Sequence, residues 1–133
     1  MKAHFARIAR LAAVMLMLGA CTGVGLHPSA EVTSTVPSWQ NWFKLDWALD
    51  AETSAGRRIT GYLYNEYGEA AYNVQLLTQA LDKAGAVVHQ RIDWAGRVPP
   101  LSRSYFEVRN LPPAEQYRVT VWAFDFRQGQ SWP

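Results

Sequence analysis

The sequence predicts an all-β protein: a single antiparallel β-sandwich of six to seven short strands behind an N-terminal signal helix and a tether. Three observations lead to this prediction. After residue 37, apolar and polar residues alternate with a period of two over most of the chain. β-branched and aromatic residues dominate the alternating runs. Turn residues separate the runs at intervals of about 8–15 residues, which is typical of sandwiches.

The first 20 residues have the organisation of an export signal. A basic segment with Lys2, Arg7 and Arg10 precedes an apolar run over residues 11–18, and small residues follow. The apolar run is shorter than the about 20 residues that span a bilayer, so we expect a removable signal over 1–20. Cleavage by an ordinary signal peptidase is the alternative, although it would place Leu18 where a small residue is preferred.

Cys21, the only cysteine of the chain, ends the run Leu18-Gly19-Ala20-Cys21. This run resembles the lipobox of bacterial lipoproteins. The resemblance implies cleavage between Ala20 and Cys21, lipidation of Cys21 and stable attachment to the cell envelope on the periplasmic side. Thr22, in place of an aspartate, resembles the pattern sorted to the outer membrane of Gram-negative bacteria. The alternative is a buried, inert cysteine.

The net charge of the chain changes when the signal is removed. The full chain has 13 Lys and Arg against 11 Asp and Glu, and Lys2, Arg7 and Arg10 lie in the signal. Cleavage therefore leaves 10 basic and 11 acidic side chains, a formal charge of −1. A near-neutral domain lacks the basic surface that nucleic-acid binding needs, so we predict no nucleic-acid partner.

Residues 21–37 are predicted to be the lipidated cysteine and a flexible tether, because they are small, polar and interrupted by Pro28 and Pro37. A coil of this length holds a domain about 20–25 Å from its anchor on average. The remaining residues, 38–133, suffice for one hydrophobic core and are predicted to form the sandwich.

The alternating runs define the strands in order. We expect strands at 43–49 and 59–64, a hairpin pairing 73–82 with 86–94, an aromatic strand near 105–108 and a last strand at 119–124. Asp82 opens the hairpin turn and Gly85 takes its left-handed position. Residues 65–68 form a second turn, and the proline pairs at 99–100 and 112–113 exclude a central strand there. A helix over 70–82 is the alternative.

Four stretches, residues 59–65, 73–74, 80–88 and 105–108, resemble the FxLYD-type Ig-like domain of bacterial envelope proteins. Its pattern includes G-x-hydrophobic-x-N, matched here by Gly61, Leu63 and Asn65. The run with Leu111, Pro113 and Tyr117 resembles the tyrosine corner of fibronectin type III domains. Together the resemblances cover residues 57–124 and imply an Ig-like sandwich in which the Tyr117 hydroxyl bonds to the loop backbone. Such domains serve mostly as binding or spacer modules, so the resemblance implies nothing about catalysis.

The tryptophans are the candidate binding residues. All six follow the signal: Trp39, Trp42, Trp47, Trp94, Trp122 and Trp132. Trp47 is expected inside, and Trp122 on the second surface or at an edge. Trp39, Trp42 and Trp132 lie near the ends of the domain and are the candidates for an exposed patch that binds a partner or a glycan. We nevertheless favour docking of the terminal segments onto the sandwich over an exposed patch.

Catalytic and metal-binding residues are not predicted. His27 and His89 have no second histidine or cysteine at ligand spacing, so we expect no metal site. Asp93 and Asp125 are not paired in the expected register, and the sequence has no nucleophile elbow, so we expect no enzyme and no cofactor. Four arginines could form a small patch that contacts anions, but we favour protection of strand edges by their charge: Arg57, Arg58, Arg103 and Arg109.

The leading functional hypothesis is a membrane-anchored periplasmic lipoprotein that acts as a non-catalytic interaction or scaffold module of the cell envelope. It would bind an envelope protein through a sheet edge or an aromatic patch. The alternative is a glycan-binding module that uses Trp39, Trp42 or Trp132.

Overall fold

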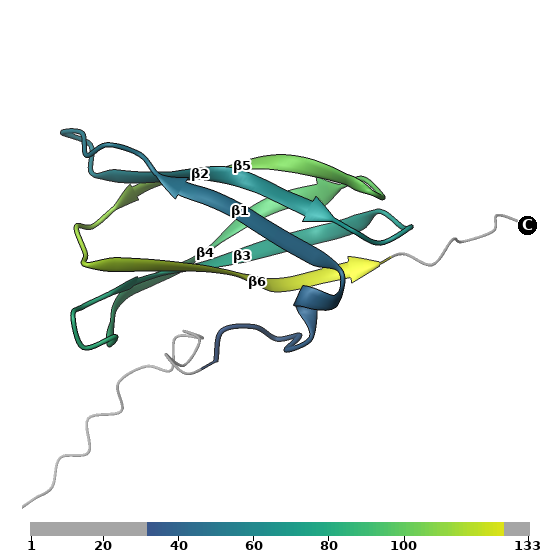
Figure 1. Ribbon diagram of the computed structural model, residues 1–133, viewed down its shortest axis with the longest axis horizontal. Coiled ribbons are helices and arrows are strands. Elements are labelled where there is room, and N and C mark those ends of the chain that lie inside the picture. The colour runs from purple at the N-terminus through teal and green to yellow at the C-terminus, as the bar shows by residue number, and fades with distance from the viewer. Residues whose placement is uncertain (1–31, 127–133) are drawn as a thin grey trace, which may run out of the picture.

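The computed structural model of the protein describes residues 32–126 (Figure 1). It contains one short 3-10 helix and six strands: η1 (Trp39–Asn41), β1 (Phe43–Leu49), β2 (Arg57–Asn65), β3 (Ala71–Leu81), β4 (Val87–Val98), β5 (Ser102–Leu111) and β6 (Gln116–Phe126). The predicted signal, Cys21 and Trp132 lie outside the described residues. Over residues 32–126, no helix has the length and apolar character needed to cross a membrane.

The strands form two antiparallel three-stranded sheets packed face to face, β1-β2-β5 and β4-β3-β6 (Figure 1). The predicted β-sandwich is therefore confirmed, with six strands in the described chain. The helix alternative over 70–82 is wrong, because this segment is the central strand β3. Every residue from 76 to 81 is buried, and β3 lies between β4 and β6 in the middle of its sheet. Such a continuous buried run has no clear period in the sequence.

The predicted hairpin between β3 and β4 is confirmed. Asp82 N–H donates to the Ala86 carbonyl at 2.9 Å, and Gly85 closes the turn with φ +81°. The Asp82 carboxylate accepts the N–H groups of Ala84 and Ala86, both at 2.9 Å. Because the turn satisfies its own backbone groups, it sets the register of β3 and β4.

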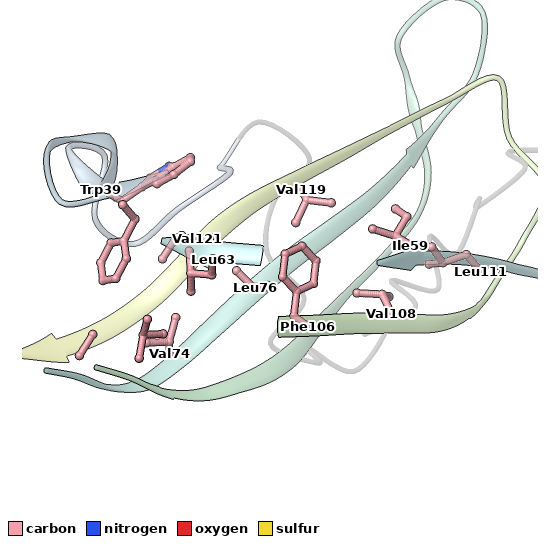
Figure 2. Packing of buried hydrophobic residues seen from close by; sticks show 13 residues of the cluster. Trp39, Ile59, Leu63, Val74, Leu76, Phe106, Val108, Leu111, Val119 and Val121 are labelled. Carbon is pink, nitrogen blue, oxygen red and sulfur yellow. The ribbon is translucent and has the colours of Figure 1, made fainter. Parts of the chain in front are cut away.

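One hydrophobic core fills the space between the sheets (Figure 2). Each sheet contributes the inward residues of its strands: Ile59, Leu63, Phe106 and Val108 from one, Val74, Leu76, Val119 and Val121 from the other. The residues of the opposite phase face outward, on the two outer faces of the sandwich.

The corner between β5 and β6 contains the hydrogen bond expected for Tyr117. Leu111 ends β5 with its side chain buried, and the Tyr117 hydroxyl donates to the carbonyl of Pro112. Pro112 lies in the loop between β5 and β6, and the tyrosine hydroxyl gives its carbonyl a hydrogen-bond partner there.

A Tyr117→Phe variant is expected to lose about 0.5–1.5 kcal/mol of folding free energy, because it removes one net hydrogen bond and keeps the ring. The measurement is the urea midpoint of unfolding. Tyr105→Phe is the matched control, since the exposed Tyr105 ring lies on an outer face. Equal midpoints for the two variants would show that the corner bond contributes nothing.

The N-terminal segment packs against β6 before the predicted domain start at residue 38. The N–H and the hydroxyl of Thr35 both donate to the Trp122 carbonyl, at 2.9 and 2.7 Å. The Thr120 hydroxyl donates to the Thr33 carbonyl at 2.6 Å. The predicted boundary is therefore too late, because the small polar residues of this segment bind β6. The part of the predicted tether at 22–31 lies outside the described residues.

Candidate functional site

The predicted tryptophan patch is not formed by Trp39 and Trp42. Trp39 is buried in the end of the core, as Figure 2 shows. Trp42 is half-buried, with its ring edge-on to those of Phe124 and Phe126 at 5.7 and 6.1 Å. The exposed patch is therefore wrong for these two residues, and the favoured docking of this segment is found, because Trp39 is part of the core and Trp42 packs against it. The third member, Trp132, lies outside the described residues.

Exposed aromatic residues gather instead on the outer face of the β1-β2-β5 sheet. Tyr62 and Tyr64 on β2 alternate with the buried residues Leu63 and Asn65, so their rings point outward. Tyr62 pairs with Tyr105 on β5, and Tyr64 pairs with Arg103. We call Tyr62, Tyr64, Arg103 and Tyr105 the tyrosine face.

The three rings of the tyrosine face form one cluster. The centroids of Tyr62 and Tyr105 are 5.8 Å apart in an edge-on arrangement, and Tyr62 and Tyr64 are 6.4 Å apart. Tyr62 is 37% exposed and Tyr105 is 55% exposed. The rings are carried by adjacent hydrogen-bonded strands, so this apolar surface is rigid and open to solvent.

Arg103 places a fixed positive charge on this aromatic surface. Its guanidinium carbon lies 4.1 Å from the Tyr62 ring centroid and 5.9 Å from that of Tyr64. Its Nη1 donates to the Tyr64 hydroxyl at 3.3 Å, and this hydrogen bond raises the pKa of Arg103. A guanidinium held over a ring keeps several N–H donors free for a ligand, because it has five in all.

A hollow of about 460 Å³ adjoins the tyrosine face at one end. Tyr64 and Arg103 form one wall, and the turns after β2 and before β5 contribute Glu66, Leu101 and Ser102. Leu101 is 73% exposed and has a left-handed backbone with φ +50°, which is uncommon for leucine. Its N–H donates to the Tyr67 carbonyl at 3.0 Å, which holds this turn against the neighbouring one.

At the other end of the same face, charged residues pair with one another. Arg58 contacts Asp50 at 2.6 Å and Glu107 at 3.3 Å, and Arg109 contacts Glu107 at 2.5 Å. The hydrogen bond from Arg109, with the charges of Arg109 and Arg58, lowers the pKa of Glu107 against the opposing effect of burial. Exposed pairs of this kind contribute little stability.

The four candidate arginines therefore do not form one anionic contact patch. Arg57 lies 3.6 Å from Glu52 and donates to the Ala114 carbonyl, away from the tyrosine face. Arg58 and Arg109 pair with carboxylates. Arg109 lies on the edge strand β5, as edge protection predicts, whereas Arg58 lies on β2, the central strand of its sheet, so the edge interpretation is wrong for Arg58. Arg103 alone of the four contacts the tyrosine rings.

The remaining titratable candidates are dispersed. Asp93 pairs with Arg91 at 2.9 Å, and Asp125 accepts a hydrogen bond from Asn73 at 3.1 Å. Across residues 32–126, histidine, cysteine and carboxylate side chains do not gather in a group of three that could hold a metal ion. His89 lies on β4 within this range, whereas His27 lies outside it.

Sequence reasoning missed the tyrosine face although the signal was present. The outward phase of the run at 59–64 carries Tyr62 and Tyr64, and Tyr105 lies in the aromatic strand near 105–108. Two outward aromatic runs indicate a shared surface only if their strands are neighbours, and that pairing joins β2 to β5 across two intervening strands.

No protein-family model, no curated protein and no solved structure matches this chain.

Proposed function

We propose that the protein is a lipid-anchored, non-catalytic interaction module of the bacterial cell envelope, and that the tyrosine face binds its protein partner. The observation that carries the proposal is the cluster of Tyr62, Tyr105 and Arg103 on a rigid outer face. Tyrosine and arginine are enriched among residues that dominate binding energy. Because strands hold these side chains in place, little conformational entropy is lost on binding.

The sequence features support the anchor and the module type. The run Leu18-Gly19-Ala20-Cys21 resembles a lipobox, so the proposed anchor is an acylated Cys21 on the periplasmic side, with the outer membrane favoured by Thr22. An Ig-like domain related to the FxLYD or fibronectin type III type is supported by the sheet order β1-β2-β5 against β4-β3-β6 and by the Tyr117 corner. Such domains serve many functions, so the surface and not the fold carries the proposal.

A glycan ligand is the second candidate, and it now rests on tyrosines in place of tryptophans. The hollow beside Tyr64 combines an aromatic wall with the polar side chains of Glu66, Ser102 and Arg103. Sugar rings stack on aromatic faces while their hydroxyls need polar partners, so this end of the tyrosine face is where a glycan would bind.

The binding test is crosslinking in intact cells with a photoreactive residue at position 105 of the full chain. A protein partner should be captured, and Tyr62→Ala with Arg103→Gln should reduce its affinity by about 30-fold or more, as expected for hot-spot residues. Glu115→Gln is the control, since Glu115 is exposed and lies at the corner between β5 and β6, outside the tyrosine face. Capture that is unchanged by the double variant would contradict a binding role for this face.

The anchor has a separate test. Cys21→Ser should block acylation and leave the protein unprocessed, which is measured by membrane fractionation and by electrophoretic mobility. Retention and mobility equal to those of the unmodified protein would overturn the lipoprotein part of the proposal.

A further inference from the structure

The outer face of the other sheet, β4-β3-β6, carries a tryptophan that the sandwich leaves uncovered. Trp94 on β4 is 69% exposed, and Ile92, two residues earlier on the same strand, is 37% exposed. Trp94 pairs with Gln75 and Ile92 pairs with Leu77, so both side chains share the face that points away from the core. An exposed tryptophan beside an exposed isoleucine on an edge strand indicates a surface that something else covers.

The polar groups in the middle of this face are already satisfied by one another. Gln79, which is fully buried, donates from its side-chain amide to Gln90 at 2.9 Å and accepts from Arg118 at 2.7 Å. These residues pair across β4, β3 and β6, so they lie on the same face as Ile92. If another surface covered this face, these amides would keep their hydrogen-bond partners. The desolvation penalty of burying them would therefore be small.

The chain enters the domain along the same face. Thr120 pairs with Leu77, as Ile92 does, and its hydroxyl donates to the Thr33 carbonyl at 2.6 Å. Figure 1 shows the dark blue N-terminal segment next to β6, on the side away from β1, β2 and β5. Since β4 lies two strands from β6, Trp94 is on the order of 10 Å across the face from this entry point.

The length of chain before the domain limits how far this face can be from a membrane anchor. Only ten residues, 22–31, separate Cys21 from Val32. A chain of this length reaches about 35–40 Å when fully extended and spans about 17–20 Å as a flexible coil. An anchor at Cys21 would therefore keep the entry face of the domain close to the lipid headgroups.

We infer that the outer face of β4-β3-β6 binds the surface of the lipid bilayer, with Trp94 and Ile92 inserted at the headgroup level. The inference rests on the proposed lipid anchor of Cys21. Tryptophan favours the interface because its ring is apolar and its N–H can still donate to a polar group. At the far end of β4, Arg97 lies over the Tyr72 ring at 5.5 Å, which adds a cation suited to lipid phosphates.

A bilayer fits this face better than a protein does. The exposed large apolar side chains of β4 are Val88, Ile92 and Trp94, and three such residues make a contact far smaller than the 20–30 residues a side of a standard protein interface. A weak contact is sufficient for a surface to which the chain is already tethered, because the anchor raises the effective concentration of lipid. Binding in this orientation directs the tyrosine face, on the opposite side of the sandwich, away from the membrane and toward its partner.

The test uses the protein purified from the membranes of cells that express the full chain, reconstituted into vesicles of phosphatidylethanolamine and phosphatidylglycerol that contain brominated lipid. Flotation measures attachment of the protein to the vesicles. Quenching of tryptophan fluorescence by the bromine atoms measures contact between tryptophan side chains and lipid. Trp94→Phe retains an aromatic ring but removes this fluorophore, so lipid-dependent quenching should fall at least about twofold while flotation is unchanged. Tyr105→Phe on the tyrosine face is the matched control and should leave the quenching as it was.

The outcomes separate the two proposals. Flotation with quenching that Trp94→Phe does not reduce would overturn the membrane face and leave the anchor intact. Failure of the unmodified protein to float would overturn the anchor, and with it the membrane face. A photoreactive residue at position 94 gives a second measurement: capture of lipid supports the inference, whereas capture of a protein in place of lipid contradicts it.

Discussion

A Gly61→Ala variant is expected to lose about 2–3 kcal/mol of folding free energy, the upper part of the range for inserting a methyl group into a packed core. An added Cβ would lie 2.3 Å from the Asp46 carbonyl oxygen, 2.7 Å from the Trp47 Cβ and 2.8 Å from the Trp47 Cα. Two of these three atoms belong to the backbone of β1, so no side-chain rotation can relieve the overlap. The whole strand β1 must move away from β2.

The measurement is equilibrium urea unfolding followed by circular dichroism. Gly68→Ala is the matched control, because a Cβ at Gly68 would meet no atom within 4 Å. The control should stay within about 0.5 kcal/mol of the unmodified protein, as most surface changes do. A Gly61→Ala midpoint equal to that of Gly68→Ala would show that β1 does not pack on Gly61 as described.

An Asn65→Ala variant is expected to lose roughly 2–4 kcal/mol, because several buried polar groups lose their partner together. Asn65 is 2% exposed. Its Nδ2 donates to the Glu69 carbonyl at 2.7 Å and to the Val98 carbonyl at 3.3 Å, and its Oδ1 accepts the Tyr67 N–H at 3.0 Å. The side chain thus joins the end of β2, the turn that follows it and the end of β4.

Hydrogen exchange distinguishes this role from a general loss of packing. The Tyr67 amide should exchange much faster in Asn65→Ala than in the unmodified protein, because its acceptor is gone. Asn41→Ala, at an exposed position in η1, is the control and should change neither the exchange of Tyr67 nor the unfolding midpoint. Unchanged protection of Tyr67 in Asn65→Ala would contradict the proposed linkage.

Gly61 and Asn65 both belong to the sequence pattern that resembles the FxLYD-type domain, yet the pattern does not explain why these residue types are needed. The reason for Gly61 lies on β1, and one of the three bonds of Asn65 reaches β4. A pattern read along one strand contains no information on the atoms of other strands. The physical role of each residue therefore became visible only when the strands were packed together.

The sequence determined those features that depend on neighbouring residues. A period of two identified the strands, because alternate residues of a strand face opposite sides of the sheet. Asp82 and Gly85 determined the hairpin, since a short turn forms its own hydrogen bonds. The Tyr117 corner was predictable for the same reason, as the tyrosine lies five residues from the carbonyl that it binds.

Tertiary structure alone decided which surfaces are exposed. Trp39 and Trp42 are covered because η1 meets the ends of β1 and β6, while Trp94 stays exposed on an edge strand. The tyrosine face exists because β5 pairs with β2 and not with a strand adjacent in sequence. Exposure and strand pairing depend on contacts between residues far apart along the chain, and local alternation cannot specify those contacts.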